Sequence, residues 1–298
     1  MANNRYPVVC FGEILWDILP QGSVPGGAPM NVAYHLSRLG QRPAIITRVG
    51  FDDMGKELIN IFSGYGITTD FFQIDYKIQT GRVYAEFREN NEVLYNIIKP
   101  AAWDFIEWED DFKPLIQQAE YFVFGSLITR NKQSKNILFK CLEIANTKVF
   151  DINLRAPYFN KKIIEELLKK SDILKMNLAE LHLITGWFRD YKSNNDRIKL
   201  LKERFNINSI VVTKGGEGAI LDYDSTFHNH SGYSVKVEDT VGSGDAFLAG
   251  IVSKLIDRAP PGEVLDFASM LGAFVASKKG ACPNYTLNIL DQMHSLKN

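Results

Sequence analysis

Short β-rich apolar segments alternate with helical segments along most of this chain, and that alternation restricts the possible folds more than any other feature. Residues 7–12 form an apolar run typical of a buried strand. Residues 29–39 combine an early proline, apolar spacing and a following glycine, which indicates a helix. The same rhythm predicts strands at 44–49, 121–124, 148–152, 173–176 and 210–213, a hairpin at 219–223 and 227–230, and helices at 54–63, 161–170, 178–185, 244–256, 262–278 and 287–295.

Strands that alternate with helices form a mostly parallel sheet covered by helices on both faces. Residues 71–98 break the rhythm, because they alternate as strands around an Asn90-Asn91 turn with no helix between them. The pattern therefore predicts an α/β fold with one mostly parallel central sheet flanked by helices, and a small second sheet that stands off it. No linker or internal repeat divides residues 1–298, so we expect a single domain.

Composition excludes several classes of function. Of 298 residues, 45% are hydrophobic and 23% are charged, as in ordinary globular proteins. The formal net charge of −1 gives no bulk basic charge for nucleic-acid binding, and no apolar run approaches the roughly 18 residues of a membrane span. Residues 1–7 do not resemble a signal peptide. Three well-separated cysteines without a Cys-x-x-Cys pair indicate reduced thiols and a cytoplasmic protein.

The sharpest candidate site is residues 239–245, Asp-Thr-Val-Gly-Ser-Gly-Asp, directly before an apolar helix. Two glycines at a helix start let backbone N–H groups converge on an anion, and the helix dipole favours negative charge there. Asp245 is then a candidate base beside a bound phosphate. A glycine-rich loop with Asp245 as a simple helix cap is the alternative interpretation. The segment is neither a P-loop nor a dinucleotide-binding fingerprint, since Phe247 stands where that fingerprint needs glycine.

Other candidates follow predicted strands or precede a predicted helix. Residues 26–31, Gly-Gly-Ala-Pro-Met-Asn, permit close approach of a ligand to the backbone, and Asp17 follows the first strand. Residues 151–155 and 175–180 offer carboxylates and amides that suit Mg²⁺, and residues 212–218 offer small residues that suit phosphates and ribose. Each segment by itself is also compatible with a plain turn, cap or surface loop.

Taken together and in order, these segments resemble the ribokinase-like (PfkB) carbohydrate kinase family. Residues 26–40 look like its first signature, residues 239–247 look like its second, and Asn177-x-x-Glu180 matches its Asn-x-x-Glu motif. The residues at positions 12–13, 124–126 and 151–155 are most similar to those of the bacterial fructokinases. Ser243, Ile152 and Leu178 depart from the residues common in that branch, but none of them removes a catalytic group.

The resemblance implies an ATP-dependent sugar kinase in which Asp245 takes the proton of a sugar hydroxyl. It implies that the amides of Gly242, Ser243 and Gly244 stabilise the transferring phosphoryl group. It also implies a β-sheet lid over the sugar, formed mainly by residues 13–25 and 71–100. The residues that it assigns to the sugar substrate are Asp17, Gly27, Asn31 and Arg155.

The resemblance also implies ATP, Mg²⁺ and K⁺ as cofactors. Residues assigned to the nucleotide are Asn177, Thr213, Gly215 and Gly218. Glu180 is assigned to Mg²⁺ through water, and Asp239 and Val241 to K⁺.

The expected partners are a small-molecule sugar and ATP, with no nucleic acid and no membrane, and a homodimer remains open. Fructose is the expected sugar, with 2-keto-3-deoxygluconate, ribose and nucleosides as alternatives within the family. A non-catalytic sugar-sensing module and a dinucleotide oxidoreductase are the alternatives from other classes. The sequence leaves the phosphorylated hydroxyl undetermined.

Overall fold

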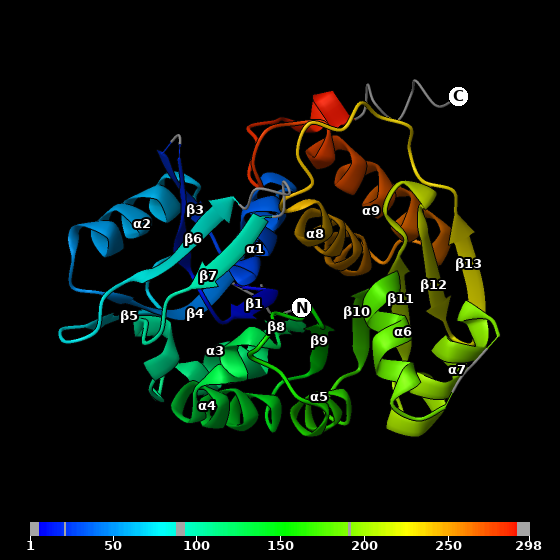
Figure 1. Ribbon diagram of the computed structural model, residues 1–298, viewed down its shortest axis with the longest axis horizontal. Helices are drawn as coiled ribbons and strands as arrows, with labels where there is room; N and C mark the ends of the chain where they lie inside the picture. The colour runs from blue at the N-terminus through cyan, green and yellow to red at the C-terminus, as the bar shows by residue number, and fades with distance from the viewer. Residues whose placement is uncertain (1–5, 21, 88–92, 190–191, 291–298) are drawn as a thin grey trace.

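A nine-stranded sheet forms the centre of the computed structural model, which describes residues 6–20, 22–87, 93–189 and 192–290 (Figure 1). Its strand order is β13-β12-β11-β10-β9-β8-β1-β4-β5. The bounds are β1 Val8–Phe11, β4 Pro43–Gly50, β5 Phe72–Asp75, β8 Tyr121–Gly125, β9 Thr147–Asp151, β10 Ile173–Asn177, β11 Ser209–Thr213, β12 Ala219–Tyr223 and β13 Thr226–His230. The seven strands from β11 to β5 are parallel, and the hairpin β12–β13 adds an antiparallel edge. The mostly parallel central sheet predicted from the sequence is confirmed.

Helices cover both faces of this sheet, as Figure 1 shows. Their bounds are α1 Ala28–Arg38, α2 Asp53–Gly64, α3 Phe112–Gln118, α4 Lys132–Leu142, α5 Lys161–Leu168, α6 Leu178–Gly186, α7 Asn194–Phe205, α8 Ser243–Ile256 and α9 Pro261–Ala276. Helices α3 to α7 pack on one face, and α1, α2, α8 and α9 pack on the other. No helix within the described ranges is long and apolar enough to cross a membrane.

The central strand β1 explains why both faces are buried. Val9 and Phe11 belong to the core on the α3–α7 side, whereas Val8 and Cys10 belong to the core on the α1–α2 side. All four side chains are completely buried. Because successive side chains of a strand point to opposite faces, a continuous apolar run needs cover on both sides. The chain supplies that cover with its alternating helices.

A second, four-stranded sheet has the order β3-β2-β6-β7. Its strands are β2 Leu15–Leu19, β3 Gly22–Gly26, β6 Gly81–Phe87 and β7 Val93–Ile97. The prediction that residues 71–98 all belong to this sheet is wrong at its start, because β5 pairs in parallel with β4 at the edge of the central sheet. Alternation alone does not identify a partner strand. The predicted Asn90-Asn91 turn lies outside the described residues, as does the predicted helix beyond Leu290.

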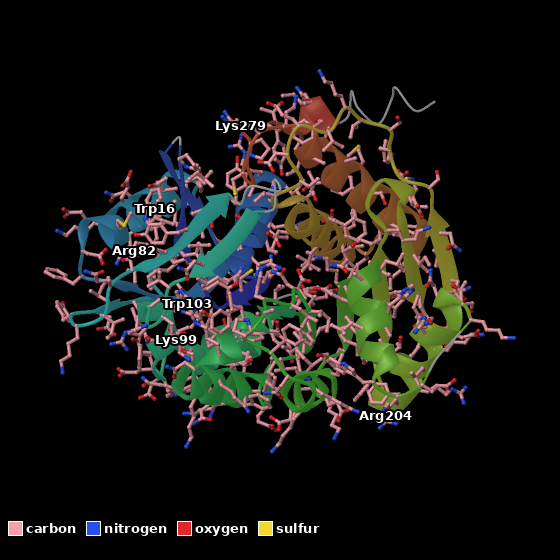
Figure 2. All side chains as sticks on the ribbon, in the orientation of Figure 1. Trp16, Arg82, Lys99, Trp103, Arg204 and Lys279 are labelled. Atoms are coloured by element: carbon pink, nitrogen blue, oxygen red, sulfur yellow. The ribbon has the colours of Figure 1, made fainter. Side chains whose placement is uncertain are left out.

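A buried ion pair holds the C-terminal end of the small sheet against the domain. Arg130 donates to both carboxylate oxygens of Asp104 at 2.7 and 2.8 Å, and both side chains are fully buried. Its guanidinium lies 3.7 Å from the ring centre of Trp103 and donates to the carbonyl oxygen of Ile98 at 2.7 Å. Trp103 is labelled in Figure 2, near the start of β6 and the end of β7. The pair therefore fixes the point where β7 rejoins the main domain.

Asp104→Ala should destabilise the protein strongly, because it leaves the buried Arg130 charge unpaired. Removing one partner of a buried pair costs about 3–5 kcal/mol. Urea denaturation of both proteins measures the difference in the free energy of unfolding. Lys56→Ala is the matched control, because it breaks the exposed Lys56–Asp53 pair and should leave the midpoint unchanged. Equal midpoints for Asp104→Ala and the wild type would contradict this account.

Candidate active site

A cavity of about 550 Å³ lies beyond the carboxyl ends of β1, β9, β10 and β11. Leu15, Val83 and Ile97 of the small sheet form one of its walls. Ligands of open α/β sheets bind at this edge, beyond the carboxyl ends of the parallel strands. The cavity collects most of the residues predicted from the sequence: Asp17, Gly27, Asn31, Arg155, Asn177, Thr213, Gly215, Val241, Gly242, Ser243, Gly244 and Asp245.

The start of α8 forms a second wall of this cavity. Gly242 is the N-cap in the left-handed region, with φ of 75°, and a Cβ there would collide with Ala281. Both facts require glycine. The N–H groups of a helix's first turn have no partner within the helix, so they are available to an anion. Ser243 is an exception among the three amides predicted to bind the phosphoryl group. Its N–H already donates to the carbonyl oxygen of Thr240 at 3.3 Å.

Asp245 follows in the first turn of α8, and its carboxylate accepts a hydrogen bond from Nδ2 of Asn31 at 2.7 Å. The amide oxygen of Asn31 accepts from the thiol of Cys282 at 3.4 Å, which orients the NH₂ group toward Asp245. Burial raises the pKa of Asp245 to about 6, although the nearby Lys175 charge lowers it. The carboxyl therefore carries negative charge at neutral pH and retains basicity, as a general base needs.

Lys175 and Asp151 form a buried ion pair beneath this helix start. Nζ of Lys175 lies 3.1 and 3.0 Å from the two carboxylate oxygens of Asp151. A Cβ on Gly244 would lie only 3.0 Å from the same Nζ. Lys175 begins the 175–180 segment, but the local pattern assigns it no role. A lysine inside a buried strand was the available signal, because such a residue almost always has a charged partner.

Asn177 and Glu180 form a capping box at the start of α6. Oδ1 of Asn177 accepts from the Glu180 N–H, and Glu180 accepts from the Asn177 N–H, both at 2.9 Å. The other oxygen of Glu180 accepts from the N–H of Leu154 at 2.8 Å, so the carboxylate joins two loops of the site. Asn177 lines the cavity, whereas Glu180 lies behind its wall. The contact of Glu180 with Mg²⁺ through water stays a prediction.

Asp17 and Arg155 both line the predicted sugar region. Asp17 is on β2, and a Cβ at Gly26 would collide with its carboxylate, so glycine leaves room for that group. Burial raises the pKa of Asp17 to about 6, and the positive charge of Arg155 partly opposes the increase. Arg155 follows β9, and its exposed side chain still lines the cavity. An acceptor and a cation thus face one space.

A second cavity of about 610 Å³ continues from the first and shares Thr213, Gly215 and Gly244 with it. Tyr233 and residues of α9 extend it away from the small sheet. Gly218 lines this second cavity, with φ of 87°, and a Cβ there would collide with the carbonyl oxygen of His230. Three of the predicted nucleotide residues, Thr213, Gly215 and Gly218, therefore border a second compartment that meets the first at the start of α8, whereas Asn177 lines only the first.

Asp239 lies outside the walls of both cavities. Its two carboxylate oxygens accept from the N–H groups of Val241 at 2.9 Å and Gly280 at 3.1 Å, which ties two segments near α8 together. Val241 lines the first cavity. Within the described residues, no three His, Cys, Asp or Glu side chains are grouped as a metal site. K⁺ at Asp239 and Val241 stays a prediction.

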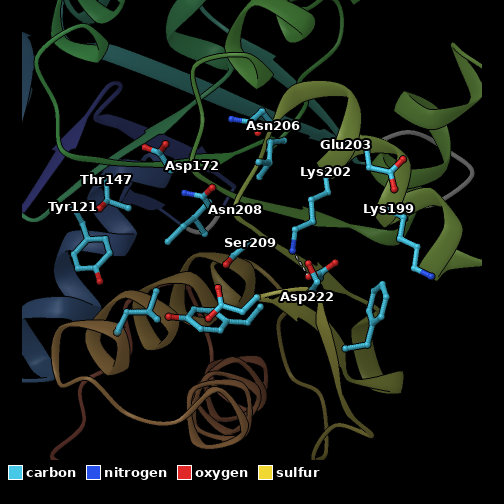
Figure 3. A pocket seen from close by; sticks show the side chains of 17 residues that line it. Tyr121, Thr147, Asp172, Lys199, Lys202, Glu203, Asn206, Asn208, Ser209 and Asp222 are labelled. Atoms are coloured by element: carbon cyan, nitrogen blue, oxygen red, sulfur yellow. Dashed lines mark hydrogen bonds and ion pairs between the residues drawn. The ribbon is translucent and has the colours of Figure 1, made fainter.

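A third cavity, of about 730 Å³, lies at the opposite edge of the central sheet (Figure 3). It is bordered by Tyr121, Thr147 and Ser209, which are the first residues of their strands. Nζ of Lys202 pairs with the buried Asp222 at 2.6 Å in its wall. None of the residues that the sequence assigns to a ligand lines this cavity. It is therefore separate from the candidate active site.

Comparisons with known proteins agree with this arrangement. The sequence profile of the pfkB family carbohydrate kinases matches residues 21–287. Fructokinase-2 of Solanum habrochaites is 29% identical over 95% of this chain and 94% of its own length. Probable fructokinase-6, chloroplastic, of Arabidopsis thaliana is 33% identical, with 93% and 79% covered. A fructokinase double mutant from Vibrio cholerae O395, solved with fructose, ADP and a potassium ion, superposes with a TM-score of 0.83 at 24% identity, covering 98% of this chain and 99% of that one.

Asp245→Asn should make the protein more stable at pH 8. The folded state holds the Asp245 proton up to about pH 6, whereas an ordinary aspartate releases it near 3.8. Stability contributed by the protonated group is therefore lost as the pH rises from about 4 to about 6. Asparagine avoids this loss, and we expect a gain of about 3 kcal/mol, the worth of a shift of roughly two pKa units.

Urea denaturation of both proteins at pH 8 and below pH 4 measures this effect, and the difference should vanish at the lower pH. Asp53→Asn is the matched control, because Asp53 is also in the first turn of a helix but is exposed. Its stability should not rise at pH 8. A destabilised Asp245→Asn at pH 8 would show that ionised Asp245 supports the fold.

Proposed function

This chain belongs to the pfkB family of carbohydrate kinases, and we propose that it transfers the γ-phosphoryl group of ATP to a hydroxyl of fructose. The observation that carries the proposal is the position of Asp245. It lines the first cavity and directly follows Ser243 and Gly244, which line both cavities at the start of α8. The relatives named fructokinase align over nearly the whole chain, which supports fructose as the sugar.

In this proposal, each substrate occupies one cavity. The sugar binds beside the small sheet, where Asp17, Gly27 and Asn31 line the wall. ATP binds beside Thr213, Gly215 and Gly218, with its γ-phosphate at the start of α8. The small sheet acts as a lid that excludes water, which would otherwise accept the phosphoryl group. Phosphoryl transfer depends mainly on such positioning and on charge stabilisation.

The chemical step uses one base and one anion site. The reacting sugar hydroxyl gives its proton to the Asp245 carboxylate while its oxygen attacks the γ-phosphorus. The bond from that phosphorus to the β,γ-bridging oxygen breaks, and ADP leaves. The amides of Gly242 and Gly244 face the charge that spreads over the phosphoryl oxygens, whereas the Ser243 N–H is held by Thr240. Lys175, held by Asp151, adds a positive charge behind the helix start.

Metal ions enter the proposal in two ways. Mg²⁺ arrives as part of MgATP and keeps most of its ligands from water and phosphate, as this ion prefers. Asn177 and Glu180 would orient that complex from the start of α6. K⁺ would lie beside Asp239 and Val241, and the Vibrio cholerae relative contains a potassium ion. The supporting observation is that the Asp239 carboxylate accepts hydrogen bonds from the N–H groups of both Val241 and Gly280 and so holds these two segments together.

A reducing cytoplasm is the proposed location, supported by the three free thiols of Cys10, Cys141 and Cys282.

An acidic sugar such as 2-keto-3-deoxygluconate is the second candidate substrate, because the cationic side chain of Arg155 lines the sugar cavity. Ribose is the third. These alternatives differ only in the sugar, so one assay separates them.

Purified protein should phosphorylate fructose with MgATP at a higher kcat/KM than ribose or 2-keto-3-deoxygluconate. An assay that couples ADP release to NADH oxidation measures turnover for each sugar. Size-exclusion chromatography of the same preparation reveals whether a homodimer forms. Omitting K⁺ in a parallel series tests the monovalent cation. Turnover of either alternative with none on fructose would make the sugar assignment wrong and leave the kinase assignment intact.

Asp245→Asn should lower kcat by about 10²- to 10⁴-fold, the usual contribution of a general base. Asparagine is nearly isosteric but cannot accept the hydroxyl proton. ATP binding should change little, because the backbone amides at the start of α8 remain. The measurement is kcat at saturating sugar and MgATP, beside nucleotide titration. Asp53→Asn again serves as the control and should keep wild-type turnover; a folded Asp245→Asn enzyme that matches it would eliminate Asp245 as the base.

A further inference from the structure

Glu13 is a second carboxyl in the wall of the sugar cavity, and the mechanism above gives it no task. It follows β1 and Gly12 directly, and only 3% of the residue is exposed. It lines the cavity together with Asp17 and Asn31. Its Oε2 atom is buried and has no hydrogen-bond partner within the described residues. A buried polar atom of this kind needs an explanation, because leaving it unpaired costs free energy.

The surroundings of Glu13 satisfy only part of its carboxyl group. Burial raises the pKa of Glu13 to about 7, and the nearby Asp245 charge adds to the increase. Its own backbone N–H, the positive charge of Arg155 and the N–H of Ala28 at the start of α1 favour the ionised form and oppose the increase. A role as a cap therefore accounts for contacts with two backbone amides. It leaves Oε2 without a function.

The backbone places Glu13 on the sugar side of the site. A Cβ on Gly27 would lie 2.5 Å from the carbonyl oxygen of Glu13 and 3.2 Å from Cα of Ile14. The loop that carries Glu13 therefore packs directly on the glycine that precedes α1. Asn31, one turn into α1, holds the carboxylate of Asp245. Glu13 therefore packs on one end of residues 27–31 and the base is held at the other end, and both carboxyl groups line the same cavity.

We propose that Oε2 of Glu13 hydrogen-bonds one non-reacting hydroxyl of the bound sugar and so determines which sugar epimer the enzyme accepts. The proposal rests on the sugar kinase function proposed above and deepens it. A sugar hydroxyl both donates and accepts, so it can satisfy this atom in either protonation state of the carboxyl. An epimer that lacks a hydroxyl at that point leaves Oε2 buried and unpaired. Rejection of such an analogue is the usual consequence of a site built around a hydroxyl.

The test compares kcat/KM for fructose with kcat/KM for analogues that each change one hydroxyl. Psicose, tagatose and sorbose invert C3, C4 and C5, and 2,5-anhydromannitol lacks the anomeric hydroxyl. In the wild type, one of these ratios should exceed the others through the Glu13 contact. Glu13→Ala should reduce that one ratio by about 10- to 100-fold, as expected for losing a buried hydrogen bond. The remaining ratios should keep their wild-type values.

Conservative variants separate a sugar contact from a structural role. Glu13→Gln should restore most of the lost preference, since an amide can also bond a hydroxyl. Glu13→Asp keeps the charge but withdraws the oxygen, so it should lose the preference, and it carries the test if Glu13→Ala does not fold. Asn160→Ala is the matched control, because Asn160 caps α5 outside the cavity. It should lower the melting temperature and leave every ratio unchanged.

Two results would overturn the proposal. One is a folded Glu13→Ala or Glu13→Asp enzyme with all wild-type ratios. The other is an equal fall in every ratio, which would indicate a general structural role. Failure of the proposed function has a different signature: the wild type would prefer another monosaccharide to fructose. The same variants would then be compared on the single-hydroxyl epimers of that sugar, and the same outcomes would decide the role of Glu13.

Discussion

The buried ion pair between Lys175 and Asp151 is the interaction on which the rest of the site depends. It joins the ends of β9 and β10, and its ammonium fills the space directly below Gly244 at the start of α8. That contact fixes how close the helix start comes to the sheet. It also places a positive charge near Asp245, which partly offsets the effect of burial on that carboxyl. Because burying both charges costs desolvation, such an ion pair adds little net stability, and its main effect is to order the groups around it.

Several buried carboxyl groups lie near this pair, and their burial lowers the stability of the folded protein. The pKa values of Glu13, Asp17 and Asp245 are all raised by burial, and Arg155 lowers each of them only in part. Clusters of strongly shifted groups in a cavity are characteristic of functional sites. The protein compensates elsewhere, with an apolar core on both faces of the sheet. Stability and activity therefore depend on different parts of the molecule.

The sequence predicted the central strands well because each is an apolar run bounded by turn residues. It failed at β5, whose alternating pattern is equally compatible with a lid strand and with the edge of the main sheet. Among the site residues, Asp245 and the glycines around it were found because helix starts and glycine loops have local signals. The local pattern assigns no role to Glu13 or Lys175. Their importance comes from burial and missing partners, which are properties of the folded chain.

The sequence by itself determined the fold class, the family and the order of the site segments. These follow from local periodicity and from short motifs whose chemistry is carried within a few residues. Only the tertiary structure decided which groups meet, because those contacts join residues far apart in the chain. Asn31 bonds Asp245 across 214 positions, and Cys282 bonds Asn31 across 251. The unpaired oxygen of Glu13 is likewise a consequence of packing, since no local pattern reports which atoms lack a partner after folding.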